Sequence, residues 1–88
     1  MNNILRFLGF NAEDKVTRFK GVITSVSFDL YGCVQFLINP GLNKDGVLES
    51  SNWFDVSRVD IKVTVPPVME SPDFTDYINQ GPESKPVF

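Results

Sequence analysis

The alternation of apolar and polar residues predicts short β-strands through the middle of the chain. The clearest alternation covers residues 59–65, and similar patterns cover residues 22–28 and 33–39. A period of two residues is typical of a strand that buries one face. We expect the first strand to begin near Val16, with a bulge or bend at Gly21. This register predicts a core that contains Val26, Phe28, Val34, Phe36, Ile61 and Val63.

Turn-forming residues separate the predicted strands. The sequence Asp-Leu-Tyr-Gly at 29–32 predicts a hairpin turn in which the final glycine adopts a positive φ. Residues 41–52 are rich in Gly, Asn, Lys, Asp and Ser, which predicts a solvated loop with a turn of its own. A short strand is expected at 53–56, and residues 57–58 predict a tight turn into the last strand.

These elements predict a mainly β fold, a small closed or half-closed SH3-like barrel over residues 14–65. Closing the sheet would remove edges that aggregate. Residues 1–13 predict a short N-terminal helical lead, with apolar residues at helical spacing before Gly9. One or two helical turns are not stable alone in water. The lead is therefore expected to cover the barrel as a lid, or to contact another subunit or a partner. Residues 11–14 are expected to be a polar joint.

Residues 66–88 predict an extended, proline-containing C-terminal tail. Pro66 and Pro67 cannot donate backbone hydrogen bonds, so they end the sheet. The tail nevertheless has more apolar side chains than a plain linker. We expect them to lie as anchors along a barrel surface, on the same chain or on a neighbour. They are Met69, Phe74, Tyr77, Ile78, Val87 and Phe88.

Composition narrows the possible partners. The chain has 88 residues and a net charge of −3, which argues against a duplex nucleic acid as partner because such binding requires a basic surface. No apolar run is long enough to span a membrane, and none is expected to do so. A domain this small has a marginal core, and many such domains form homo-oligomers, which we also expect here.

Candidate catalytic and metal-binding residues are few. The chain has no histidine, and its single cysteine, Cys33, therefore lacks the usual base; we expect it to be a small buried residue in a reducing compartment. Asp29 and Asp55 are best explained by turn or ion-pair chemistry. No cluster of metal ligands and no phosphate-binding glycine loop is present in the sequence. We therefore expect no enzyme activity, no cofactor and no metal.

Four residues predict a binding surface, because their types commonly contribute to interface energy: Tyr31, Gln35, Trp53 and Arg58. Tyr31 lies in a predicted turn, where a purely structural residue is usually small. Trp53 follows the loop, where aromatic residues of SH3-like barrels line a groove for extended peptides. Each has a structural alternative: Trp53 packs in the core, Tyr31 packs on its hairpin, and Arg58 pairs with Asp55 to stabilise the turn.

A distinctive set of segments covers most of the chain: residues 14–17, 19–21, 29–35, 53–56 and Arg58, followed in the tail by 67–70, 72–74, 81–83 and 85–86. As a set, these segments resemble a family of small uncharacterised proteins of tailed bacteriophages, prophages and other mobile elements. The resemblance implies a mobile-element origin and expression in the cytoplasm of a bacterial host, and it implies no catalytic residues.

Together these features favour a non-catalytic module that binds a protein, either a bacterial protein or another copy of itself, and that modulates a host system. A second reading is a small structural component of the virion or of its assembly, acting by self-association. A third is an oligomer that sequesters a small ligand between its subunits.

Overall fold

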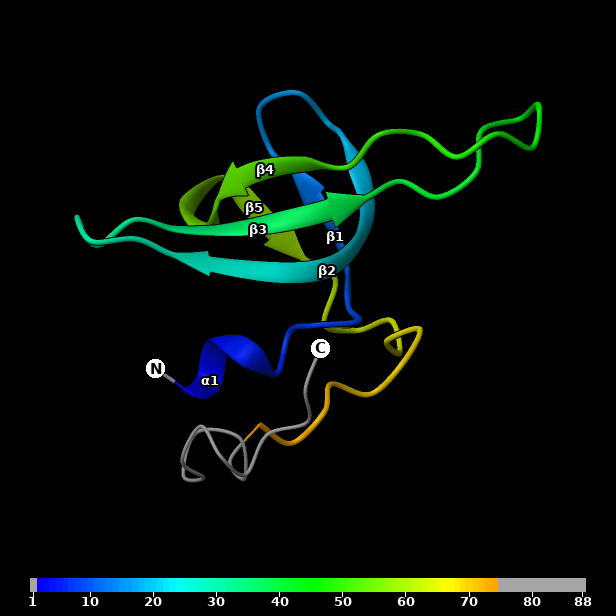
Figure 1. Cartoon of the computed structure of the whole chain (residues 1–88). Coiled ribbons are helices and arrows are strands. Elements are labelled where there is room, and N and C mark those ends of the chain that lie inside the picture. Colours follow the sequence, from blue (N-terminus) through cyan, green and yellow to red (C-terminus); the bar gives the residue numbers. More distant parts are fainter. Residues whose placement is uncertain (1, 75–88) are drawn as a thin grey trace, which may run out of the picture.

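The structure, a computed structural model, describes residues 2–74 of the chain (Figure 1). It is mainly β, with five antiparallel strands in one sheet of order β4-β3-β2-β1-β5. The two edge strands, β4 and β5, pair with no further strand in the described residues, so the sheet is open and the predicted closed barrel is not formed. The elements are α1 (Asn2–Leu5), β1 (Asn11–Asp14), β2 (Lys20–Phe28), β3 (Val34–Asn39), β4 (Asn52–Asp55), the 3₁₀ helix η1 (Val56–Arg58) and β5 (Val59–Ile61).

The last strand is shorter than the alternation predicts, because its partner strand ends. Ile61 pairs with Ala12, and the Lys62 N–H still donates to the Asn11 carbonyl at 2.8 Å. Before Asn11 the chain turns toward β2 instead, where the Phe10 carbonyl accepts from Ile23. Residues 63–65 therefore have no strand to pair with and form a turn, and Val63, predicted to be buried, is 64% exposed.

The first strand also differs from the prediction. Residues 11–14, expected to be a polar joint, form β1, whereas the segment after them, expected to begin a strand near Val16, forms a turn. The Asp14 carboxylate holds this turn by accepting from the Thr17 backbone N–H at 2.8 Å and from its hydroxyl at 2.5 Å. Arg18 adopts a φ of 68°, which a strand does not allow.

A β-bulge in β2 changes which residues face the core. The register shifts between Ile23 and Ser25, so the pairing passes from Ile23 opposite Ile38 to Val26 opposite Phe36. Ile23 and Val26 consequently share the core face although they are three residues apart. The bulge lies at Thr24 and not at Gly21, where it was predicted.

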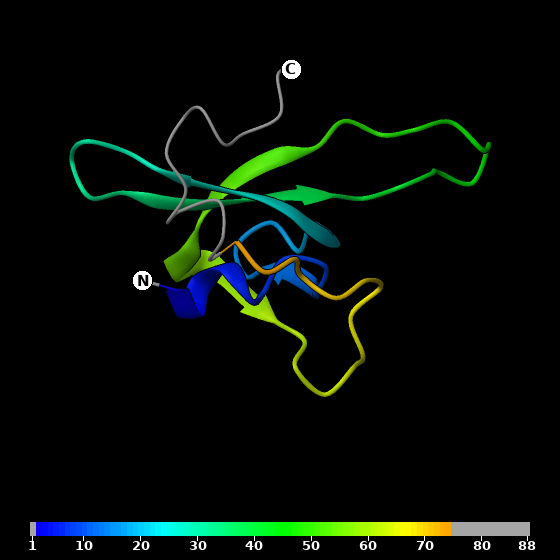
Figure 2. The same cartoon turned by 60° about the horizontal axis from the view of Figure 1, so that its bottom comes forward.

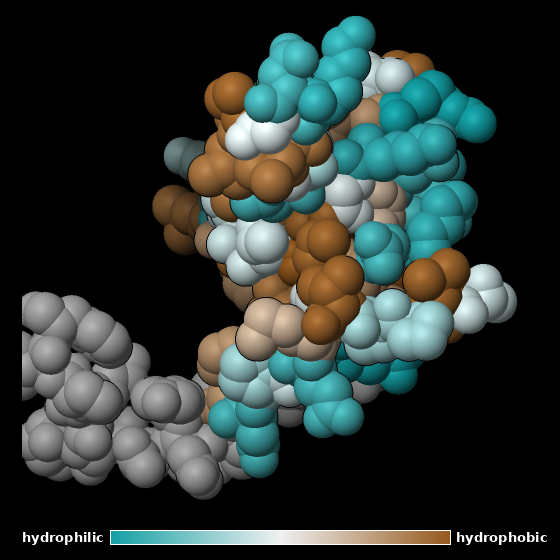
Figure 3. All heavy atoms as spheres, turned by 90° about the vertical axis from the view of Figure 1, so that its right-hand side faces the viewer, coloured by the Kyte–Doolittle hydropathy of each residue, from teal (hydrophilic) through white to brown (hydrophobic). Residues whose placement is uncertain are grey.

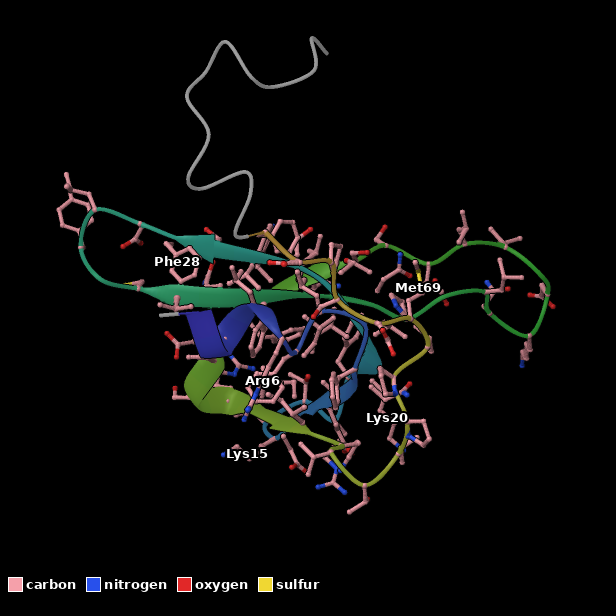
Figure 4. All side chains as sticks on the ribbon, turned by 90° about the horizontal axis from the view of Figure 1, so that it is seen from below. Arg6, Lys15, Lys20, Phe28 and Met69 are labelled. Atoms are coloured by element: carbon pink, nitrogen blue, oxygen red, sulfur yellow. The ribbon has the colours of Figure 1, made fainter. Side chains whose placement is uncertain are left out.

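The core contains Phe36 as predicted, but not Phe28. Phe36 is 1% exposed, whereas Val26, Val34 and Ile61 are half-buried and Phe28 is 48% exposed. Phe28 lies near the end of the β2–β3 hairpin, beyond the reach of the other core elements (Figure 4). The fully buried apolar residues are Ala12, Ile23, Phe36, Ile38, Phe54 and Val59.

The N-terminal lead packs on this core. Only a single helical turn, α1, is present, and turns continue from it to Gly9. The Phe7 ring meets Phe36 edge to face, with 6.5 Å between centroids, and it also meets Phe10 at 5.7 Å. Such aromatic contacts add to the burial energy. The lead thus packs on one side of the open sheet, and the predicted lid has no closed barrel to cover.

Two hairpins project from the ends of the sheet (Figures 1 and 2). The β2–β3 turn is at one end, with Gly32 at a φ of 88°, as predicted. At the other end, residues 41–51 form an arm: Leu42 bridges to Leu48, and the Asn43 N–H donates to the Val47 carbonyl. The arm is exposed and has a turn at residues 44–46, as predicted, and one β-bridge pairs its two sides.

Residues 66–74, here called the strap, run back across the lead and β2. The Val68 N–H donates to the Gly9 carbonyl at 2.9 Å. The contact is so close that a Cβ on Gly9 would lie 2.2 Å from the Met69 carbonyl oxygen. This part of the predicted tail does lie along the chain's own surface; Tyr77, Ile78, Val87 and Phe88 fall outside the described residues.

Candidate functional site

The alternation along the three strands β2, β3 and β4 builds a second face, opposite the core. Phe36 pairs with Phe54 on the core side, so their neighbours in the register point the other way. Gln35 stands opposite Asp55, and Leu37 stands opposite Trp53. We call this set the outer face: Ser25, Ser27, Gln35, Leu37, Trp53 and Asp55.

Trp53 is the largest side chain of the outer face. It is 45% exposed, although an indole of this size is normally buried to a greater extent. Leu37 is directly opposite on β3 and partly buried, and Gln35 is two residues further along the same strand. Cross-strand and diagonal neighbours lie close enough for side chains to touch. The prediction of core packing for Trp53 is therefore wrong, and the structure brings Trp53 and Gln35 onto one face.

Tyr31 lies at a different place. It is 86% exposed at the tip of the β2–β3 hairpin, beside Leu30, which is 90% exposed. Asp29 holds this tip, since its carboxylate accepts from the backbone N–H groups of Tyr31 and Cys33 at 2.9 Å each. The tip and the start of β4 are at opposite ends of β3 (Figure 1), so Tyr31 and Trp53 are not neighbours.

Arg58 serves an internal contact. Its guanidinium donates to both oxygens of Asp14, from Nε and from Nη2, each at 2.8 Å, and it also lies 5.4 Å above the Phe54 ring. The expected partner, Asp55, instead accepts from the N–H and hydroxyl of Ser57 and thereby caps η1. Arg58 thus forms an ion pair, as predicted, but its partner is Asp14 and not Asp55.

The buried carboxylates of β1 are paired with cationic side chains. The Arg58 guanidinium holds the pKa of Asp14 well below its usual range, and the Thr17 hydrogen bonds act in the same direction against the effect of burial. Glu13 and Asp60 stand opposite each other in β1 and β5, an arrangement that repels. Lys62 relieves it, lying 3.6 Å from one carboxylate and 2.6 Å from the other.

Cys33 is exposed, not buried as the sequence predicted, because it lies in the hairpin end beyond β3. The nearby Asp29 carboxylate raises the pKa of the Cys33 thiol, and partial burial and the charge of Asp55 act in the same direction. A raised thiol pKa lowers the thiolate fraction and with it the nucleophilicity. Asp29 and Asp55 therefore disfavour the thiolate form of Cys33.

Two further observations concern the described residues only. Within residues 2–74, His, Cys, Asp and Glu side chains do not gather in threes as a metal site would require. The helical segments there are also too short to cross a lipid bilayer.

Sequence reasoning did not select the residues that complete the outer face. Leu37 was assigned by alternation to the face opposite Phe36, and that signal was correct, but its pairing with Trp53 requires the register of β3 with β4. Ser25 alternates with Val26 after the bulge, as the pattern predicts, whereas Ile23 lies before the bulge and is on the core face although the pattern groups it with Ser25.

Comparisons with known proteins found no protein-family model, no curated protein and no solved structure that matches this chain. The candidate site therefore rests on the geometry of the outer face. The resemblance to mobile-element proteins stays a prediction.

Proposed function

We propose that this protein is a non-catalytic module that binds another protein through the outer face of β2, β3 and β4. The observation that carries the proposal is the position of Trp53, a half-exposed indole on the face of the sheet opposite the core. Tryptophan is among the residues that dominate interface energies, and a partner would bury the area that this chain leaves in water.

The composition of the outer face supports a protein as the partner. An indole and a leucine lie among serines, an amide and a single carboxylate, so the face is amphipathic and nearly neutral. This mixture is typical of non-obligate protein interfaces, whereas a nucleic acid requires clustered basic side chains. In Figure 4, Lys20 lies apart from Arg6 and Lys15, so these basic residues do not form one patch.

Other properties of the chain fit the same proposal. Asp14 and Glu13 are held in ion pairs, and Cys33 has a raised thiol pKa, so none of them is poised for catalysis. On the resemblance described above, the module comes from a phage or mobile element and acts on a protein of the host cytoplasm.

The strand order and the turn before the last strand support an SH3-like arrangement of the sheet. The strand order places β1 between β2 and β5, and η1 forms a tight turn between the short β4 and the final strand. We propose that the chain is an SH3-like half-barrel whose sheet curls around the core without closing.

An affinity-capture experiment with variants tests the binding proposal. The immobilised full chain is incubated with a bacterial lysate, and bound proteins are identified by mass spectrometry. We expect a specific protein whose affinity falls roughly thirtyfold with Trp53→Ala, since a hot-spot residue contributes about 2 kcal/mol or more. Leu37→Ser should weaken the same complex.

The matched control is Val47→Ser on the arm, which removes an exposed apolar side chain away from the outer face. It should leave capture unchanged. Capture that is indifferent to both Trp53→Ala and Leu37→Ser, in variants that remain folded, would contradict the proposal.

Exposed apolar residues at both projecting hairpins favour a second candidate, a structural component that self-associates. Leu42, Val47 and Leu48 of the arm are each at least 59% exposed, and Leu30 of the other hairpin is 90% exposed. Apolar (brown) and hydrophilic (teal) side chains adjoin on the side from which the arm projects (Figure 3). Under this candidate, light scattering gives an oligomer that Leu42→Ser together with Leu48→Ser dissociates, and the protein is found in purified virus particles.

A further inference from the structure

An apolar pocket lies beneath the strap. Its floor is formed by residues 22–24 of β2, one wall by Leu8 and Gly9 of the lead, and the other wall by residues 68–72 and Phe74 of the strap. The volume is about 300 Å³. None of these residues belongs to the outer face, so the pocket is a separate feature of the molecule.

The strap is anchored to the lead at Gly9, beside the pocket. The Val68 N–H is bonded to the Gly9 carbonyl, and the Met69 carbonyl rests against the bare Cα of Gly9. Figure 4 shows Met69 on the strap, on the same side of the molecule as the arm and away from Phe28. The strap approaches the lead closely at this one point, while the bulge at Thr24 breaks the regular surface of β2 opposite it. A hollow between the two follows from that geometry.

The size and lining of the pocket decide the class of its occupant. A volume of about 300 Å³ is at the lower end for small-molecule sites, and an apolar cavity of about half that volume holds benzene. A pocket of this volume is too small for a helix, whose diameter with its side chains is about 10 Å. The lining is almost wholly aliphatic and aromatic, so transfer of an apolar molecule from water is favourable.

Charge narrows the class further. Glu70 is the one ionisable side chain among the residues that line the pocket, and it is exposed at the rim. A carboxylate there repels an anionic ligand such as a fatty acid and tolerates a neutral one. We propose that the pocket under the strap binds a neutral apolar molecule of up to three rings, or of similar branched aliphatic bulk.

Two related probes test this site on the full chain. N-phenyl-1-naphthylamine is neutral and fluoresces in apolar surroundings, and 8-anilinonaphthalene-1-sulfonate is the same molecule with an added sulfonate. The wild-type protein should give saturable enhancement at one site with the neutral probe and bind the sulfonate roughly tenfold more weakly. Glu70→Gln should reduce the difference in affinity between the neutral probe and the sulfonate.

Matched variants locate the site. Thr24→Phe fills the pocket from its floor and should weaken binding of the neutral probe at least roughly tenfold. Ser71→Phe fills it from the strap and should do the same, which keeps the test decisive if one variant does not fold. Thr64→Phe places the same ring at an exposed position outside the pocket and should bind the probe like the wild type.

The proposal is overturned if the full chain shows no saturable binding, including the case in which the chain's own residues after Phe74 occupy the pocket. It is also overturned if both filled variants fold and bind the neutral probe like the wild type, because the probe then sits elsewhere, for example on the exposed apolar arm.

Discussion

At the residue scale, Asp14 determines more of the local structure than any apolar residue near it. Its side chain has no exposed surface, yet it accepts two bonds from Arg58 and two from Thr17. A buried charge is tolerated only when it is paired and hydrogen-bonded in this way. The carboxylate thereby joins the β1–β2 turn to the end of η1, across 44 positions of sequence.

This pairing predicts a particular dependence of stability on pH. Because the pKa of Asp14 is lower in the folded chain than in the unfolded chain, the unfolded state binds more protons in acid. The contribution of Asp14 is fully present above about pH 4 and is lost as the pH falls below that value. Asp55 and Asp60, whose pKa values are also lowered, act in the same sense.

Urea denaturation at a series of pH values between neutrality and pH 2 measures this effect. Asp14→Asn should be less stable than the wild type at pH 7, and the gap should narrow in acid. Asp45→Asn, at the exposed tip of the arm, is the control and should track the wild type throughout. An Asp14→Asn variant that loses stability in acid as steeply as the wild type would show that Asp14 does not carry the effect.

Two phenylalanines on the same face of the β2–β3 hairpin test the observed core. Phe36→Ala should lower the free energy of unfolding by about 3–5 kcal/mol, because the ring is fully buried and its loss leaves a cavity. Phe28→Ala should cost about 1 kcal/mol or less, since half of that ring is in water. Equal losses in chemical denaturation would mean that the hairpin end is as well packed as its centre.

At the element scale, the strap depends on Gly9. An alanine there would meet the Met69 carbonyl and would also hold a φ of 92°. Gly46 has a φ of 79° but open space around it. Gly46→Ala therefore measures the cost of the positive φ alone, whereas Gly9→Ala adds the cost of the steric contact. We expect Gly46→Ala to cost about 1 kcal/mol and Gly9→Ala at least about 1 kcal/mol more.

Chemical denaturation of both variants measures the two costs. Gly9→Ala should also weaken probe binding beneath the strap, which Gly46→Ala should not affect. If the two substitutions cost the same, the strap is not held at Gly9.

A comparison of the predicted and observed elements shows how far the sequence could predict the fold. Alternation identified β3, with Phe36 and Ile38 on the core face, and turn chemistry identified Gly32 and η1. Local patterns failed where a distant partner decides the outcome. Residues 63–65 alternate like a strand but have no strand to pair with, and β1 is polar because its buried carboxylates are neutralised by residues far along the chain.

The candidate site was predictable to a similar extent. Trp53 and Gln35 were selected by residue type, and the structure places them on one face. Arg58 was selected on the same ground, but its side chain is committed to Asp14, a contact that only the tertiary fold creates. Tyr31 was expected near Trp53, yet the length of β3 separates the two.

At the scale of the whole molecule, the two faces of β2, β3 and β4 have different surroundings. The core face packs against β1, β5 and the N-terminal lead, whose apolar residues cluster with Phe36 (Figure 2). The outer face instead presents Trp53, which is 45% exposed and is the only tryptophan of the chain. This asymmetry is the basis of the binding proposal, because a small domain gains from burying such a surface against a partner.

Fluorine NMR on Trp53 tests that central claim most directly. With 5-fluorotryptophan incorporated, the chain gives a single resonance, which reports on the outer face alone even when the captured partner has tryptophans of its own. We predict that the resonance of the free protein responds to solvent, as a half-exposed indole should, and that it shifts and loses this response when the partner is added. A resonance that is unchanged while the complex forms would contradict the account, because the partner would then bind elsewhere on the molecule.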